Sequence, residues 1–333
     1  MDIQRLFDPD LVMRHRLRAL AQAPANADFL LNIVTDELAE RLAAVERSFD
    51  KAITLHTHNA RMADLLQASG KVQQVFRLEQ HPLLLTPDLP DGLSIVSDME
   101  SLPVANESLA LVVSALSLHL VNDLPGLLFQ IKNALRPDGL FLAALPGSGT
   151  LSELRDALLS AEAELIGGVS PRVMPFADVR DCGALLQRAG FALPVVDAET
   201  YTVRYDNMFA LMRDLRHMGM ANPLEGRSRI PPGRRFFARA AEIYAERYAD
   251  ADGRIRASRS SSEYAEHQPD RLPMLSGHLM PARRSLFPRL CNLVADCIEH
   301  RSHIGANDSY AAYDDSGNQC RDQCVFNSGR AAC

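Results

Sequence analysis

Apolar residues recur at helical spacing early in the chain. Between Asp28 and Phe49 they follow one another in steps of three and four, which places one face of a helix at Leu31, Val34, Leu38, Leu42 and Val45. Beyond this helix short apolar runs alternate with helical stretches, and the runs predict strands over 52–55, 72–78, 93–96, 109–115 and 140–145. Short apolar strands separated by helices are typical of parallel βαβ units.

The second half of the chain predicts more helices and an antiparallel pair of strands. The clearest helix follows Asn122 and Asp123, either of which is a suitable N-cap, and Pro137-Asp138-Gly139 stops it. Two strands joined by a tight polar turn are expected over 193–198 and 201–205. Further helices are expected over 150–166, 176–189, 208–218 and 236–248, and past Arg256 the periodicity fades except for a short helix over 290–298.

These elements predict an α/β protein built on a seven-stranded, mostly parallel, doubly wound sheet with helical additions. The pattern divides the chain into an N-terminal helical cap (1–50), a core (51–206), a C-terminal helical addition (207–256) and an atypical tail expected to be poorly ordered (257–333). In such a sheet, ligands bind at the carboxyl ends of the strands. Candidate site residues are therefore sought at those ends.

Composition limits the classes of function. The chain has 333 residues, a net charge of -7 and 47% hydrophobic residues, which is typical of an acidic, soluble globular protein. No window approaches the roughly 20 apolar residues that span a membrane, and the N-terminus lacks the pattern of a secretory signal. A cytoplasmic location is expected. Negative charge without a long Lys/Arg block argues against a nucleic-acid partner.

The loop after the first predicted strand is the first candidate for ligand binding. It contains no glycine, the residue that permits positive φ and close approach of a ligand to the backbone. Asn59 is the residue of this loop best able to take a left-handed conformation in place of glycine. Glu79 ends the second strand about 20 residues later, the spacing expected for an acid that binds ribose hydroxyls. The loop consists of His56, Thr57, His58, Asn59 and Ala60.

Three more polar residues follow later strands at the same edge. Asp98 comes after the third strand, where a carboxylate can accept a hydrogen bond from an adenine amino group; a turn or cap role explains it equally well. Ser117 and His119 follow the fourth strand and are the candidates for contact with a reacting group. A lone histidine after a strand is more often a structural hydrogen-bonding residue, and that alternative stays open.

Motifs in the middle of the chain carry a family resemblance. Asp98 to Pro103, Leu109 to Pro125 and Leu135 to Gly139, in this order, resemble a class I S-adenosylmethionine (SAM) dependent methyltransferase of the type 11 group. Gly149 to Arg155, Gly167 to Val173 and Arg188 to Phe191 are similar to one branch of it, the arginine hydroxylase, methyltransferase-like assembly factor of respiratory complex I and its bacterial relatives. The resemblance runs from about Leu6 to Ser258.

The resemblance implies a Rossmann-like methyltransferase fold, with a SAM pocket formed by the first loop, Glu79, Asp98 and the segment around Ser117. It implies an enzyme that modifies a protein side chain or a small molecule. In the assembly-factor branch the reaction is hydroxylation of an arginine on a complex I subunit; a more distant relation methylates malonyl carrier protein. The alternative is a non-catalytic assembly or scaffold protein with a degenerate SAM site.

This chain departs from the family pattern at the first loop. The family has approximately Asp-Leu-Gly-x-Gly-x-Gly, where this chain has Thr54-Leu55-His56-Thr57-His58-Asn59-Ala60. The missing glycines and the missing acid are expected to weaken SAM binding. Leu120 stands where relatives commonly have a tryptophan, which removes an indole N–H donor.

The resemblance ends after Ser258, and a shifted reading frame is one explanation. Five of the six cysteines lie in the last 43 residues, within a stretch that shows no sustained pattern. A metal site there would use Cys291, Cys297, His300 and His303, but this spacing is not a standard zinc spacing, and no metal is predicted. Hydrolase, zinc-protease and P-loop motifs are absent from the sequence.

Overall fold

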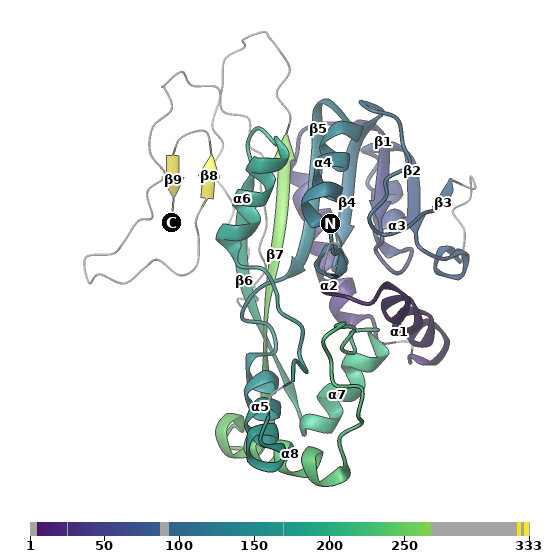
Figure 1. Cartoon of the computed structure of the whole chain (residues 1–333). Helices are drawn as coiled ribbons and strands as arrows, with labels where there is room; N and C mark the ends of the chain where they lie inside the picture. The colour runs from purple at the N-terminus through teal and green to yellow at the C-terminus, as the bar shows by residue number, and fades with distance from the viewer. Residues whose placement is uncertain are drawn as a thin grey trace.

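One mixed sheet organises the protein. The computed structural model describes residues 5–24, 26–86, 93–168 and 170–267, together with two short strands at 325–327 and 330–332. The main sheet has seven strands in the order β3-β2-β1-β4-β5-β7-β6 (Figure 1). The predicted α/β class and doubly wound arrangement are confirmed.

Five of these strands are parallel and two are antiparallel. The parallel strands are β1 (Phe49–Leu55), β2 (Val72–Glu79), β3 (Ser94–Val96), β4 (Leu109–Ala115) and β5 (Leu135–Pro146). β7 (Ile255–His267) pairs antiparallel with both β5 and β6 (Val195–Tyr205). The parallel part thus has five strands, and the expected seven is reached only with the antiparallel pair. β8 (Val325–Asn327) and β9 (Arg330–Ala332) pair with each other.

Helices cover both faces of the parallel part. α3 (Arg61–Ala68) connects β1 to β2 in one direction along the sheet, and α4 (Leu124–Ala134) connects β4 to β5 in the other. Right-handed crossovers therefore place these two helices on opposite faces. α2 (Phe29–Ala44) packs on α3, and α6 (Val179–Ala189) packs on α4. The strand order reverses between β1 and β4, the place where such sheets bind ligands.

The core is built from the central strands. All seven residues of β4 are buried, because this strand has a neighbour on each side and a helical layer on each face. A second, smaller apolar cluster lies where α5 (Ser152–Ile166), α7 (Met208–His217) and α8 (Arg234–Tyr248) pack beside β7. Figure 1 shows these helices at the lower end of the molecule, below the sheet. No helix in the described ranges is long and apolar enough to cross a membrane.

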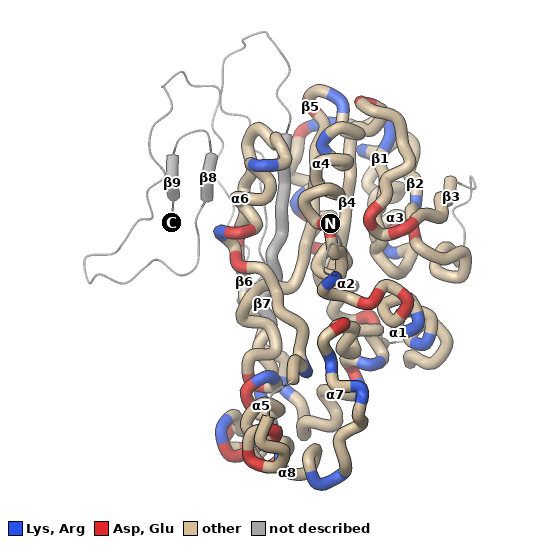
Figure 2. Tube along the Cα trace, viewed as in Figure 1, with Lys and Arg blue, Asp and Glu red and all other residues tan. Residues whose placement is uncertain are grey.

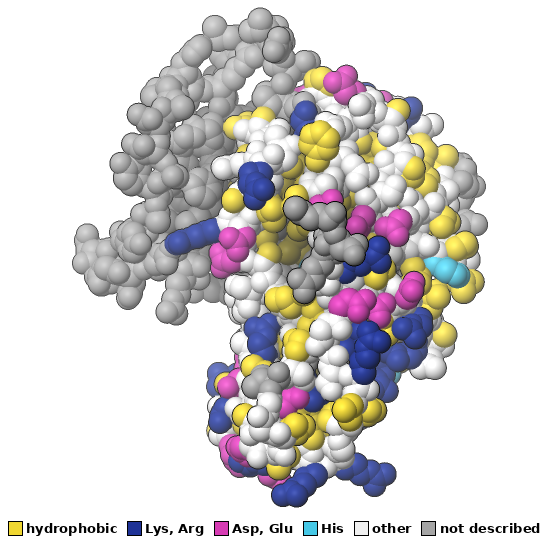
Figure 3. Space-filling view, in the orientation of Figure 1, with side chains coloured by type: hydrophobic (Ala, Val, Ile, Leu, Met, Phe, Trp, Pro, Cys, Tyr) yellow, Lys and Arg dark blue, Asp and Glu magenta, His cyan; other side chains and the backbone are white. Residues whose placement is uncertain are grey.

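Charged side chains mark the helical addition. Figure 2 shows acidic and basic residues side by side along α5 and α8. Arg239 of α8 pairs with Glu164 of α5 at 2.7 Å, and Arg247 pairs with Asp156 at 2.6 Å. Because these side chains are largely exposed, such pairs contribute little to stability and mainly set how the two helices align. Lys and Arg side chains also stand out at the lower tip of the face drawn in Figure 3.

The structure corrects three sequence-based expectations. Residues 195–205 form one continuous strand, not two strands with a turn, because β7 pairs along its whole length from Val195 to Tyr205. α1 (Pro9–Gln22) was not predicted. β7 runs across the expected boundary at residue 256, so the start of the segment called a tail belongs to the sheet. The division into four segments otherwise stays a prediction, and the helix expected over 290–298 lies outside the described residues.

The chain before α1 is fastened by a side chain from the far half of the sheet. Asn122 Oδ1 accepts hydrogen bonds from the backbone N–H groups of Leu6 and Phe7, at 2.9 and 2.8 Å, and its Nδ2 donates to Phe7 O. Asp123, the other candidate N-cap, is the residue that caps α4, accepting from Gly126 N. α4 itself ends at Ala134, before the expected stop at Pro137-Asp138-Gly139, which lies within the bounds of β5.

Replacing Asn122 with alanine is expected to destabilise the protein more than replacing Asp123. Asn122→Ala removes three hydrogen bonds and leaves two backbone donors without their partner, a loss of about 2 kcal/mol. Asp123→Ala removes one cap, a loss of about 1 kcal/mol. Urea unfolding of both variants measures the difference. Equal losses would mean that Asn122 does not fasten the N-terminal segment.

Candidate functional site

The loop between β1 and α3 keeps a glycine-like backbone without glycine. His56 and His58 have φ values of 55° and 68°, in the left-handed region that glycine favours. Asn59, the residue expected to take this conformation, does not; its side chain accepts from Arg61 N and donates to Asp28 Oδ2 at 2.9 Å. The expectation was wrong because the strained positions are the first and third of the loop, and Asn59 is used to fasten it.

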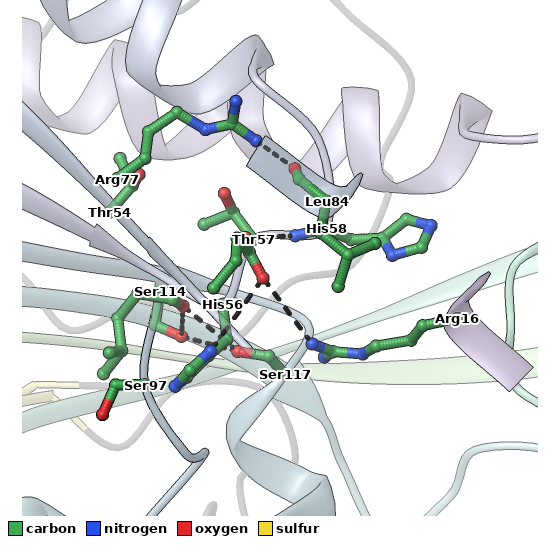
Figure 4. A network of polar contacts seen from close by, with 12 residues as sticks. Arg16, Thr54, His56, Thr57, His58, Arg77, Leu84, Ser97, Ser114 and Ser117 are labelled. Carbon is green, nitrogen blue, oxygen red and sulfur yellow. Dashed lines mark hydrogen bonds and ion pairs between the residues drawn. The ribbon is translucent and has the colours of Figure 1, made fainter. Parts of the chain in front are cut away.

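Glu79 lies at the end of β2, against this loop. It is 1% exposed, and its Oε1 accepts from His58 N at 3.0 Å. Its Oε2 lies 3.9 Å from Arg16 Nη1 and 3.9 Å from His56 Nδ1, and none of these three atoms has a hydrogen-bond partner among the described residues. In Figure 4, Arg16 and His56 approach the same point from different sides, while the His58 ring points away from His56. Sequence spacing therefore located the acid, and the structure surrounds it with protein groups.

Burial determines the charge states here. It raises the pKa of Glu79 to about 7, although the Arg16 guanidinium opposes this rise. It lowers the pKa of His56 to about 3 and that of His58 to about 4, and the positive charge of Arg16 lowers both further. Both imidazoles are therefore neutral at pH 7. Arg16 is the single cation that faces Glu79 from α1, with Arg77 acting from β2 itself.

Ser117 and His119, the candidates for contact with a reacting group, follow β4. Ser117 is fully buried, and its hydroxyl is 2.9 Å from Ser114 Oγ and 3.3 Å from Leu55 O. It thereby links the end of β4 to the end of β1, as Figure 4 also shows. His119 lies on the short helix η2 (Leu118–Leu120), 8% exposed, with its ring centroid 5.9 Å from that of Phe176. Their catalytic roles remain predictions.

Asp98 lies in the turn after β3. Its Oδ1 accepts from Glu100 N at 2.9 Å, the turn role weighed from the sequence. It also borders a cavity of about 60 Å³, in which Gln80 Oε1 is a buried acceptor without a partner among the described residues. The other lining residues include Pro9, Val12, Met99 and Leu120. An adenine-binding role for Asp98 stays a prediction.

A second cavity, of about 50 Å³, lies on the other side of Leu120. Two charged residues border it: Arg16 from α1, and Asp28, whose Oδ2 accepts from Asn59. Its other walls are formed by His58, Leu30, Leu31, Ala115, Leu116, Met218, Gly219 and Met220. Leu120 borders both cavities, and α1 contributes Pro9 and Val12 to one and Arg16 to the other.

Arg16 is the site residue that sequence analysis missed. The signal for α1 was present, since Asp8 followed by Pro9 is a typical helix start, and Asp8 does cap the helix by accepting from Leu11 N. The buried face, however, is Val12, His15, Arg16 and Ala19, which is half polar. A search for apolar stripes passes over such a helix, because arginine is rarely buried.

The described residues do not fit SAM in this conformation. Pockets that hold ligands of that size measure about 300–1,000 Å³, and the two cavities at the strand ends measure about 50 and about 60 Å³. Between them, the imidazole of His56 and the guanidinium of Arg16 are packed against Glu79. The described residues also hold no group of three or more metal-ligating side chains. Cys291, Cys297, His300 and His303 lie outside the described residues.

Comparison with known proteins gives one consistent family. A family description reading "Methyltransferase domain" matches residues 58–143. The chain is 39% identical over 258 residues to the arginine-hydroxylase NDUFAF5, mitochondrial, of Mus musculus, covering 76% of this chain and 74% of that one; for the Homo sapiens protein the identity is 38% over 256 residues, with the same coverage. The malonyl-[acyl-carrier protein] O-methyltransferase of Xylella fastidiosa is 39% identical over 164 residues, 49% of this chain and 53% of that one.

Two solved structures align with most of this chain at low identity. The YcgJ protein of Bacillus subtilis aligns with a TM-score of 0.49 at 12% identity, covering 71% of this chain and 99% of that one. Phosphoethanolamine N-methyltransferase 2 of Haemonchus contortus, solved in complex with S-adenosyl-L-methionine, aligns with a TM-score of 0.41 at 16% identity, covering 71% and 53%.

The buried histidine predicts how stability depends on pH. His56 takes up a proton below pH 6.5 when unfolded but only near pH 3 when folded, so stability is lost as the pH falls through this window. The raised pKa of Glu79 acts oppositely, adding stability as the pH falls from about 7 to 4.5, but His56 and His58 together outweigh one carboxyl. His56→Gln should therefore reduce the loss of unfolding free energy between pH 7 and pH 5 by about 2 kcal/mol.

Urea unfolding at pH 7 and pH 5 measures this effect. His217→Gln, at the partly exposed end of α7, is the control for replacing a histidine. If His56→Gln shows the same pH dependence as the unsubstituted protein, then His56 is not held neutral by burial.

Proposed function

Because the chain belongs to the methyltransferase-domain family that includes the arginine-hydroxylase NDUFAF5, we propose that it modifies an arginine side chain of a protein partner. The partner implied by the family resemblance is a subunit of respiratory complex I. The support is the higher identity of the match: relatives named arginine-hydroxylase are 38–39% identical over about three quarters of both chains. The malonyl-[acyl-carrier protein] O-methyltransferase of Laribacter hongkongensis is 33% identical over 68% of this chain and 78% of that one. The cytoplasmic location expected from the sequence stays a prediction, since those relatives are named mitochondrial.

The cavity beside His58 is the place we propose for the substrate side chain. Its walls are leucine and methionine side chains, which suit the alkyl part of an arginine. Asp28 provides a carboxylate at this wall; its Oδ2 is engaged by Asn59, and its Oδ1 makes no hydrogen bond within the described residues. A guanidinium group pairs well with a carboxylate oxygen. Asp28 is therefore the residue we assign to substrate recognition.

The single observation that carries the choice of hydroxylation over methyl transfer is the match to relatives named arginine-hydroxylase over about three quarters of both chains. The cavities at the strand ends, of about 50 and about 60 Å³, have room for part of one side chain. SAM is the cofactor that the methyltransferase domain implies, and no step of the proposed reaction is assigned to it.

A second candidate function is a non-catalytic assembly protein. It is favoured by the same closed site, because Arg16 and His56 fill the space around the acid that would bind a nucleoside. In that case the fold serves to bind the partner and no reaction takes place.

Mass spectrometry of complex I subunits distinguishes these functions. Complex I is purified from the host organism and from a strain in which this gene is deleted, and peptides containing arginine are compared. We expect one arginine to be heavier by one oxygen atom only when the gene is present; inserting this atom into a C–H bond consumes O2 and two electrons from an external reductant and releases water. A gain of one methylene unit would instead indicate methyl transfer, and an unmodified subunit with impaired complex I assembly would indicate the non-catalytic role.

Complementation of the deletion strain tests Asp28. Asp28→Asn removes the charge but keeps an oxygen that can accept from Asn59, so the loop stays fastened. The modified fraction should fall by about tenfold, which corresponds to about 1.4 kcal/mol of lost recognition. Asp64→Asn, on the exposed face of α3, is the matched control and should restore full modification. Full modification with Asp28→Asn would remove Asp28 from the recognition site.

A further inference from the structure

Helix α1 lies along the groove in which a doubly wound sheet binds nucleoside ligands. Its residues Pro9 and Val12 border the cavity beside Asp98, and Arg16, one turn further on, borders the cavity beside His58. These positions are three and four residues apart, so they share one face of the helix. One face of α1 therefore covers the whole path from the turn after β3 to the loop after β1.

Arg16 is the one residue of this face that carries a charge into the groove. It is 4% exposed, and its Nη1 has no hydrogen-bond partner within the described residues. The nearest carboxylate oxygen is Glu79 Oε2 at 3.9 Å, which also lacks a partner there. Burying a guanidinium group is costly unless an opposite charge compensates it. Glu79 is therefore the group that partly compensates the buried charge of Arg16.

The geometry points to Arg16 as an internal occupant of the nucleoside-binding groove, which excludes SAM and related nucleosides for as long as α1 is docked. The guanidinium lies beside Glu79, where an acid at the end of the second strand of such a sheet accepts the ribose hydroxyls. A nucleoside bound at Glu79 would need the space beside this carboxylate that the Arg16 guanidinium occupies. Arg16 thus determines which ligands enter, and this inference does not depend on the proposed arginine modification.

The shape of the first loop agrees with this inference. His56 and His58 have the left-handed backbone that glycine would provide, so the turn has the shape that glycine would permit. The space beside Glu79 is filled, because the His56 imidazole is completely buried there. A loop that faces the protein's own helix needs no glycine for close approach of a ligand.

α1 is also attached to the protein by contacts outside the groove. These contacts would keep its N-terminal end in place if the helix moved out of the groove. Asp8 caps the helix and pairs with Arg227 at 3.2 Å, and the chain before it is held by Asn122. Arg16 provides the contact from inside the groove. Removing that inner contact alone should loosen α1 while its outer attachments remain.

Ligand binding to the full-length protein tests this inference. Calorimetric titration with S-adenosylhomocysteine at millimolar concentration compares the unsubstituted protein with Arg16→Met, which keeps an unbranched apolar stem of similar length and removes the buried charge. We expect weak binding by the unsubstituted protein, because the ligand must displace Arg16, and at least about tenfold tighter binding by Arg16→Met. Arg14→Met, on the exposed side of α1, is the matched control and should behave as the unsubstituted protein.

Two results would overturn the inference: equal affinity of the unsubstituted protein and Arg16→Met, or absence of binding by a folded Arg16→Met. If Arg16→Met does not fold, hydrogen exchange of the unsubstituted protein decides. Competition predicts that millimolar S-adenosylhomocysteine speeds exchange of the amides of residues 9–22, and unchanged or slower exchange would contradict it. These outcomes are separate from the mass of the complex I subunits, which tests the proposed reaction.

Discussion

The buried carboxyl of Glu79 determines the arrangement of everything near it. A carboxylate taken out of water must be protonated, hydrogen-bonded or paired with a cation. Here the backbone N–H of His58 donates to one oxygen, and the guanidinium of Arg16 faces the other. Burial still raises the pKa of the carboxyl to about 7, so this compensation is incomplete. The first loop and α1 therefore meet at this one group.

The incomplete compensation has a geometric cause. Arg16 Nη1 and His56 Nδ1 both stop 3.9 Å from Glu79 Oε2, beyond hydrogen-bond distance. A small hydroxyl-bearing group between them would satisfy all three atoms, and a water molecule is the smallest such group. The site therefore keeps the polar chemistry of a hydroxyl-binding pocket while its volume has been taken by the side chains of the protein. This combination is what an inherited nucleoside site would retain after its ligand had been replaced.

The sequence predicted the parallel half of the fold well because its signal is local. β4 was predicted with the bounds that the structure has, since a strand buried on both faces appears as an unbroken apolar run. β7 was not predicted, because Arg259-Ser260-Ser261-Ser262 carries no apolar alternation and only its pairing with β5 and β6 makes it a strand. For the same reason β6 was divided at its polar middle. The extent of β6 and β7 is set by their pairing with distant parts of the chain, and the local sequence pattern does not reveal that pairing.

In the candidate site, too, local sequence signals placed some residues correctly and missed others. The place of Glu79 beside the first loop was predicted correctly, because its distance from that loop is fixed by one helix and one strand, a local constraint. Its role in binding a ribose stays a prediction. Arg16 was not found, because it reaches the site from a helix 63 positions earlier whose buried face is half polar. The positive φ was predicted at Asn59 because asparagine takes that conformation more readily than most residues. In the structure the path of the chain from β1 into α3 requires positive φ at His56 and His58 instead. The fold itself does not depend on how this site is occupied. Its core consists of apolar side chains from β1, β4 and β5 and from the helices that flank them, and these side chains pack on one another.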